Sequence, residues 1–246
     1  MSILIFYLKM VAVVFWVFYT SVLYLFIAVF SPRRNNLFAK VVNHLANGIL
    51  PILGLKLEIE GKENLTLVHP CVFIGNHQSA LDVVIYGALC PPNTVAIGKK
   101  EISWIPLFGW LFKLSGGILI DRKNKMRAIS QIDDAVRAVR ERQVSVGILP
   151  EGTRNRSGKG LLPFKKGAFH LATEAKVPLV PIIIAEFGSL ANFKGKTLKS
   201  GTIQIKVLEP ISTENIDSNQ VTSLSVQIHD RMEAILPKLR SVETSS

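Results

Sequence analysis

The chain has 246 residues, enough for one ordinary domain with a substantial core. Lysine and arginine number 29 against 18 acidic residues, so the formal net charge is +11, while 48% of the residues are hydrophobic. Excess positive charge together with excess apolar content favours a membrane surface with anionic lipid over free nucleic acid as a partner. Two cysteines, Cys71 and Cys90, form no CxxC pair, and the five histidines are scattered, which argues against a disulfide framework or a metal site and for a reduced compartment.

An almost unbroken apolar run at residues 10–30 is the first element. Its only polar members are Thr20 and Ser21, and it is long enough to cross a bilayer. A cleavable signal peptide is the rival interpretation, but no convincing small-residue cleavage site precedes Ser31. We therefore expect a membrane anchor. The flanking basic residues and the unpaired cysteines place the rest of the chain in the cytoplasm.

A second helix is predicted over residues 37–53, where apolar residues such as Val41, Leu45 and Ile49 recur at helical spacing. This helix could lie in the membrane interface as part of a two-helix anchor, or it could pack on the globular part, and the sequence leaves both placements open. We expect residues 1–54 to form the anchor and residues 55–246 to form the domain.

From residue 55 onward, short apolar strands alternate with amphipathic helices. The predicted strands are residues 55–59, 72–74, 95–97, 118–120, 144–149, 180–184 and 203–207, and the predicted helices are residues 126–143, 167–175 and 220–239. This alternation predicts an α/β fold with a mainly parallel or mixed sheet flanked by helices.

His77 lies where the predicted strand at 72–74 meets a helix. A strand fixes a side chain rigidly, and a helix N-terminus supplies oriented N–H groups and positive potential. We expect Ser79 to cap this helix, with Asp82 three positions later, where a capping box places its acid. Two interpretations follow. In the first, Ser79 and Asp82 only start a helix; in the second, His77 is a base whose tautomer Asp82 fixes. No G-x-S-x-G motif accompanies the pair, so a catalytic pair would activate an external hydroxyl group.

Charged residues gather after other predicted strands, where open α/β sheets place ligands. They are Lys99, Lys100, Arg122 and the turn Glu151-Gly152-Thr153-Arg154. Guanidinium groups bind phosphate oxygens bidentately, and the N–H groups of such a turn can serve the same anion. The sequence therefore predicts a phosphate-bearing substrate.

Two other patterns lead to weaker hypotheses. Residues 152–160 look like a phosphate-binding Walker A loop, but five residues separate the glycines instead of four, and Gly160 stands where Ser or Thr would hold magnesium. The basic residues that follow lack the interleaved aromatics of a nucleic-acid site. Residues 102–114 are rich in Trp, Phe and Leu, which is typical of core packing and also suits an acyl groove or a contact with lipid.

Taken together, these motifs resemble the glycerolipid acyltransferase family, most closely its bacterial members that acylate 1-acyl-sn-glycerol 3-phosphate. Four blocks match in order. Residues 76–82 fit N-H-x-x-x-x-D, residues 117–122 fit the second block, residues 149–154 fit F-P-E-G-T-R, and residues 177–181 fit V-P-I-I-P. Leu119 and Leu149 stand where Phe is usual, and these exchanges affect packing only.

The resemblance implies transfer of a fatty acyl group from acyl-ACP or acyl-CoA to the sn-2 hydroxyl of lysophosphatidic acid, giving phosphatidic acid, on the cytoplasmic side of a bacterial inner membrane. His77 would act as base and Asp82 would orient it. Arg154, with Lys99 or Lys100 and with Arg122 as a further candidate, would hold the acceptor phosphate, and Lys99 is slightly favoured. The turn Glu151-Gly152-Thr153 would bind substrate or steady the oxyanion. No cofactor, metal or nucleic-acid partner is implied.

Two rival functions remain open at the level of sequence. A sister acyltransferase would use glycerol 3-phosphate or another lysolipid as acceptor. A non-catalytic membrane lipid-binding protein would bind lysolipid without releasing a thiol.

Overall fold

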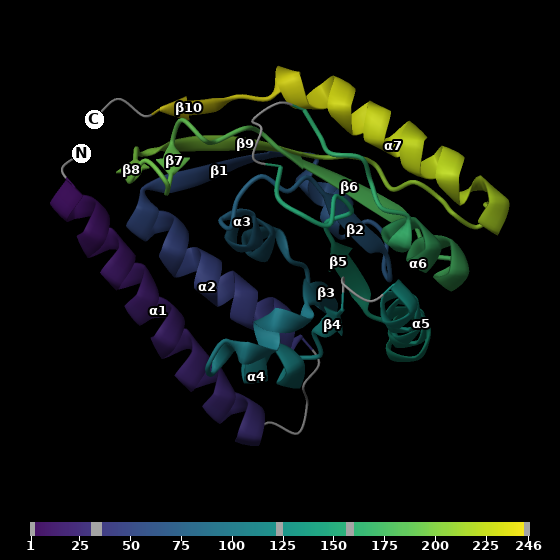
Figure 1. Cartoon of the computed structure of the whole chain (residues 1–246), viewed down its shortest axis with the longest axis horizontal. Helices are drawn as coiled ribbons and strands as arrows, with labels where there is room; N and C mark the ends of the chain where they lie inside the picture. The colour runs from purple at the N-terminus through teal and green to yellow at the C-terminus, as the bar shows by residue number, and fades with distance from the viewer. Residues whose placement is uncertain (1–2, 31–35, 122–124, 156–159, 244–246) are drawn as a thin grey trace.

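A central sheet of eight strands organises the computed structural model, which describes residues 3–30, 36–121, 125–155 and 160–243 (Figure 1). The strand order is β1-β9-β6-β2-β5-β3-β4, with β10 paired to β9. Neighbouring strands run parallel except where β9 meets β6 and β10, so the sheet is mixed. The predicted α/β fold is confirmed. The strands are β1 (Leu55–Glu60), β2 (Val72–Gly75), β3 (Thr94–Lys99), β4 (Ile118–Ile120), β5 (Ser145–Ile148), β6 (Leu179–Ile184), β9 (Gly201–Val207) and β10 (Ser241–Glu243), and β7 (Ala191–Asn192) and β8 (Thr197–Leu198) form a separate small hairpin.

Helices cover both faces of the sheet. They are α1 (Ile3–Phe30), α2 (Leu37–Leu53), α3 (Asp82–Leu89), α4 (Phe108–Leu114), α5 (Lys125–Arg142), α6 (Gly167–Ala175) and α7 (Val221–Ile235), with short 3₁₀ turns η1 (Lys62–Leu65), η2 (Lys100–Trp104), η3 (Ser218–Gln220) and η4 (Leu236–Lys238). Successive residues of a strand point to opposite faces. Phe73 therefore packs into a core with α1, α2 and α3, whereas Val72 and Ile74 pack into a second core with α5, α6 and α7.

Most predicted elements are present within a few residues of their expected bounds. The first helix begins at Ile3, earlier than the apolar run at residue 10, and the C-terminal helix passes into the turn η4 at Leu236. Apart from the 3₁₀ turns, four elements had no counterpart in the prediction. They are α4, β7, β8 and β10, each seven residues long or shorter, and such short elements carry too little periodicity to be recognised.

Of the two placements left open for the helix at residues 37–53, the structure shows packing on the domain. Helix α2 lies against α3 and β1 and buries ten side chains, and Leu45, Ile49 and Leu53 join the same core as the sheet. It ends at Gly54, whose φ of 81° is left-handed and whose N–H donates to Pro51 O. The assignment of residues 1–54 to a membrane anchor and of residues 55–246 to the domain stays a prediction.

Helix α1 is docked along α2 (Figure 1). Lys9 Nζ donates to Leu53 O at 3.1 Å, and Trp16 Nε1 donates to His44 O at 3.2 Å. The Trp16 indole also stacks on the His44 ring, with 5.0 Å between ring centroids. This approach depends on Gly48, because a Cβ there would lie 2.0 Å from the indole.

The opposite side of α1 is apolar and exposed. Its exposed side chains include Val11, Val14, Phe15, Phe18, Phe26 and Phe30. Among the described residues, α1 is the one helix that is long and apolar enough to cross a membrane.

Substitution of Gly48 tests the docking of α1. We expect Gly48→Ala to lower the free energy of unfolding in detergent by about 1–2 kcal/mol, because the displaced indole costs more than the roughly 1 kcal/mol that alanine adds to helix propensity. Gly188→Ala is the matched control, since no atom lies within 4 Å of a Cβ added there. A gain in stability for Gly48→Ala would contradict the tight contact.

Candidate active site

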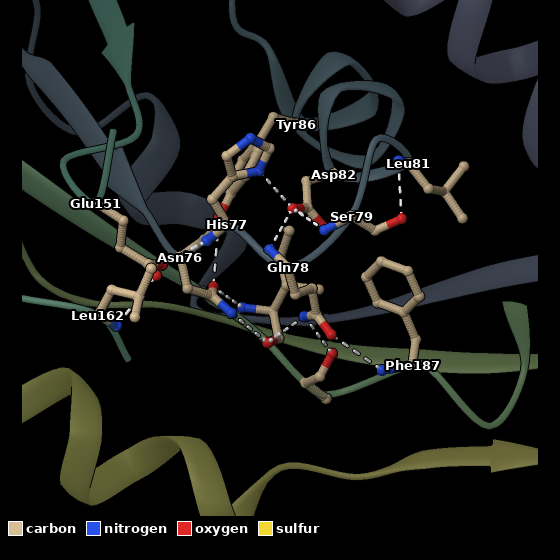
Figure 2. Close-up of polar contacts among 12 residues, drawn as sticks. Asn76, His77, Gln78, Ser79, Leu81, Asp82, Tyr86, Glu151, Leu162 and Phe187 are labelled. Carbon is tan, nitrogen blue, oxygen red and sulfur yellow. Dashed lines mark hydrogen bonds and ion pairs between the residues drawn. The ribbon is translucent and has the colours of Figure 1, made fainter. Parts of the chain in front are cut away.

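Asn76 fixes the backbone just beyond β2. Its Nδ2 donates to Ile184 O at 2.9 Å and its Oδ1 accepts the Ile184 N–H at 2.8 Å, so a side chain continues the pairing of β2 with β6 (Figure 2). Tyr86 of α3 donates its hydroxyl to Asn76 O at 2.9 Å. Burial raises the pKa of Tyr86 well above its ordinary value, so the hydroxyl keeps the proton that it donates. The next residue, His77, therefore starts from a fixed position.

Asp82 is the first residue of α3 and is fully buried. Its Oδ2 accepts three hydrogen bonds, from His77 Nδ1 at 2.7 Å, Gln78 N at 2.6 Å and Ser79 N at 2.8 Å (Figure 2). The positive end of the α3 dipole lies at the same place and favours the charged carboxylate. The predicted contact between His77 and Asp82 is therefore present.

The predicted N-cap at Ser79 is wrong. Helix α3 begins at Asp82, and the Ser79 hydroxyl accepts the Leu81 N–H at 3.3 Å. Half of the predicted capping box is present, since Asp82 accepts the Ser79 N–H. The helix starts late because the Asp82 carboxylate reaches back to Gln78 and Ser79 and holds the preceding residues in a turn.

The His77 side chain lines a cavity. In the tautomer whose Nδ1–H donates to Asp82, Nε2 carries the lone pair, and no described residue donates to it. The side chain is 13% exposed, enough for a substrate to reach it. This is the arrangement of a general base with its orienting carboxylate.

Glu151 supports His77 from behind. It is 2% exposed, its Oε1 accepts the His77 N–H at 2.7 Å, and its Oε2 accepts the Leu162 N–H at 3.1 Å. It is not among the residues that line the cavity, whereas Gly152, Thr153 and Arg154 are. Burial raises the pKa of Glu151 above its ordinary value of 4.5, although the two N–H groups act in the opposite direction.

The four predicted phosphate ligands have different surroundings. Lys99 and Arg154 are exposed and line the cavity. Lys100 does not line it, and its Nζ lies 2.7 Å from Asp121 Oδ2 in an ion pair. Arg122 lies outside the described residues. Lys99 and Arg154 are thus the cations that the structure brings to the cavity with His77.

The cavity has a volume of about 820 Å³, within the range of small-molecule sites. Most of its wall is apolar and comes from α2, α3, β3 and the segment at residues 102–112, including Val42, Val83, Ile97, Phe108 and Phe112. The polar residues of the wall include His77, Lys99, Glu101, Thr153 and Arg154. A ligand with an apolar chain and an anionic head suits this combination.

A second set of contacts holds the loop behind His77, and no motif in the sequence predicts it. Asn155 N donates to His77 O at 2.7 Å, and Asn155 Nδ2 donates to Gly160 O at 2.7 Å. Glu233 of α7 accepts the Leu161 N–H at 2.6 Å. An isolated glutamate on an amphipathic helix carries no local signal for such a role, because its partner is a backbone group far away in sequence.

Within the described parts of the chain, no three His, Cys, Asp or Glu side chains gather closely enough to hold a metal ion.

Comparison with known proteins agrees with this geometry. A family profile described as Acyltransferase matches residues 56–185. The 1-acyl-sn-glycerol-3-phosphate acyltransferases of Escherichia coli and Salmonella typhimurium are each 36% identical to this chain over 210 residues, which cover 85% of this chain and 84% of the relative. The chain belongs to the acyltransferase family. This acyltransferase also shares its fold with the crystal structure of the 1-acyl-sn-glycerophosphate (LPA) acyltransferase PlsC from Thermotoga maritima, with a TM-score of 0.74, 23% identity and 95% of both chains covered.

The raised pKa of Glu151 predicts a pH dependence of stability. The folded protein binds this proton more tightly than the unfolded chain, so the contribution of Glu151 is fully present below its ordinary pKa of 4.5 and is lost as the pH rises through the higher folded value. We expect the free energy of unfolding of Glu151→Gln to lack this decline with rising pH. Urea unfolding in detergent, measured from below pH 4.5 upward, gives the free energy at each pH. Glu141→Gln, on the exposed side of α5, is the control and should retain the decline. Identical pH profiles for wild type and Glu151→Gln would contradict the assignment.

Proposed function

We propose that this acyltransferase moves a fatty acyl group from acyl-ACP or acyl-CoA to the sn-2 hydroxyl of 1-acylglycerol 3-phosphate, forming phosphatidic acid. The observation that carries the proposal is the His77–Asp82 pair, with His77 lining a cavity that joins an apolar wall to the cations Lys99 and Arg154. The relatives that match over most of their length bear the name of this activity, which supports the same acceptor.

The reaction needs one base and no covalent enzyme intermediate. His77 Nε2 removes the proton of the acceptor hydroxyl while that oxygen attacks the thioester carbonyl carbon. A new C–O bond forms, the C–S bond then breaks, and the imidazolium returns the proton to the departing thiolate. Asp82 holds the tautomer and stabilises the imidazolium, as its 2.7 Å contact with Nδ1 allows.

The turn after β5 serves the developing oxyanion. The Gly152 N–H already donates to Leu149 O at 3.1 Å, whereas no described residue accepts the Thr153 N–H, so Thr153 is the better donor. Glu151 acts by holding the His77 backbone and not by touching substrate. Arg154 and Lys99 bind the acceptor phosphate, and the apolar wall accommodates an acyl chain.

The same proposal places the active site at a bilayer. Residues 1–54 anchor the chain through the exposed apolar side of α1, and residues 55–246 form the catalytic domain on the cytoplasmic side of a bacterial inner membrane. The net charge of +11 suits anionic lipid, and the two free cysteines suit a reduced compartment. Lipid bilayer, lysophosphatidic acid and the thioester donor are the partners in this proposal.

Thiol release tests the reaction. Reconstituted wild-type protein should release thiol from an acyl thioester only when lysophosphatidic acid is present. We expect His77→Ala to lose about 10²- to 10⁴-fold in kcat, the usual contribution of a general base, and Asp82→Asn to lose kcat with an unchanged acceptor KM. Release without acceptor would indicate a thioesterase, and release only with glycerol 3-phosphate or another lysolipid would indicate a sister enzyme. No release with any acceptor would leave a lipid-binding protein.

The KM for the acceptor tests whether Lys99 or Lys100 binds the acceptor phosphate. We expect Lys99→Ala and Arg154→Ala each to raise the KM for lysophosphatidic acid by about tenfold with little change in kcat, because each removes a cation from the phosphate. Lys100→Ala is the matched control, since Lys100 is paired with Asp121, and it should leave that KM unchanged. A larger rise in KM for Lys100→Ala than for Lys99→Ala would overturn the choice.

A further inference from the structure

Two tryptophans project from the segment η2–α4, residues 100–114, which we call the Trp hairpin. Trp104 is 74% exposed and Trp110 is 63% exposed, and Ile105 between them is 48% exposed. Tryptophan is usually largely buried, and a contiguous exposed apolar patch marks an interaction site. Neither tryptophan lines the cavity, so the acceptor site does not account for them.

The backbone of the Trp hairpin is tightly packed, so the exposure of the tryptophans is built into the fold. A Cβ on Gly109 would lie 2.6 Å from Ile102 O and 2.7 Å from Ser103 O, so α4 rests directly on η2. Gly109 N also donates to Ile105 O at 2.8 Å, and Ser103 Oγ donates to Lys100 O at 2.7 Å. A rigid support of this kind holds both indoles away from the core.

The inner side of the same hairpin forms part of the cavity wall. Ile102, Phe108 and Phe112 line the cavity, and Phe112 packs edge-on against Phe38 of α2 at 5.6 Å between ring centroids. Ile105 both lines the cavity and is nearly half exposed, so it lies at the rim. Whatever covers the outside of the hairpin therefore borders the entrance to the site.

The surroundings of the hairpin indicate a lipid surface. Helix α4 touches α1, whose outer side is apolar and exposed, so the two apolar surfaces are neighbours (Figure 1). Exposed Lys113 on α4 and Lys99 at the cavity supply positive charge beside the indoles. Indole rings next to lysines are typical of the boundary between acyl chains and anionic headgroups.

We propose that the Trp hairpin is a second lipid-contact element, separate from α1, which inserts Trp104 and Trp110 among the headgroups of an anionic bilayer. Its insertion sets the rim of the cavity at the level where a lysolipid acceptor lies. The kinetic consequence rests on the function proposed above, whereas the insertion itself does not require it.

Fluorescence tests the insertion. The chain has three tryptophans, so the emission of wild type minus that of Trp104→Phe/Trp110→Phe reports these two indoles alone. In vesicles of phosphatidylethanolamine and phosphatidylglycerol, we expect this difference emission to be quenched by lipids brominated on their acyl chains and protected from aqueous iodide. Quenching by iodide without quenching by bromine would overturn the proposal.

Kinetics test its consequence. With lysophosphatidic acid in the same vesicles, Trp104→Ser/Trp110→Ser should raise the acceptor KM, expressed as surface concentration, by about tenfold with kcat unchanged. With a short-chain acceptor dissolved as monomers, the same double variant should have the KM and kcat of wild type. Val226→Ser is the control, because Val226 is 54% exposed on α7, on the far side of the molecule from α4 (Figure 1). Equal losses on both acceptors would overturn the role at the rim. Bromine quenching in a wild type that acylates nothing would support the lipid contact and refute the proposed function.

Discussion

The candidate site depends on one buried carboxylate oxygen. Asp82 Oδ2 collects the His77 ring nitrogen and the N–H groups of Gln78 and Ser79, so a single atom fixes both the imidazole and the backbone that carries it. Its partner oxygen, Oδ1, is buried with no hydrogen bond from a described residue, so Oδ2 makes all the hydrogen bonds seen for this side chain among the described residues. The surrounding residues hold His77 and Asp82 in these positions.

Support for His77 comes from parts of the chain that are distant in sequence. Asn76 joins it to β6, Glu151 and Asn155 hold its backbone N–H and C=O, and Glu233 anchors the loop behind them. In front of it, an apolar wall and two cations face one cavity. The two groups of residues therefore have different roles. Residues behind His77 bind backbone groups, and residues in front of it line the cavity where a ligand can bind.

Most of the fold could be predicted from the sequence because its strands and longer helices have strong periodicity. The contact between His77 and Asp82 was predictable as well, since both residues lie in one short segment whose turn chemistry is readable. The start of α3 was not, because a carboxylate that accepts three donors delays the helix beyond the usual cap. Lys99 could be favoured only slightly over Lys100, since Lys99 ends β3, Lys100 begins η2, and only the position of Asp121 shows which of the two is paired. Glu151 and Glu233 act on backbone groups, which leave no mark in a sequence.

The order in which the chain is made gives the distant support of His77 a further meaning. Helix α1 leaves the ribosome well before Ile184 and Glu233, which complete the surroundings of His77. Contacts of large sequence separation form only after the intervening residues exist. A nascent chain therefore presents its apolar helix long before the support of His77 is complete, so the candidate site becomes ordered only late in synthesis.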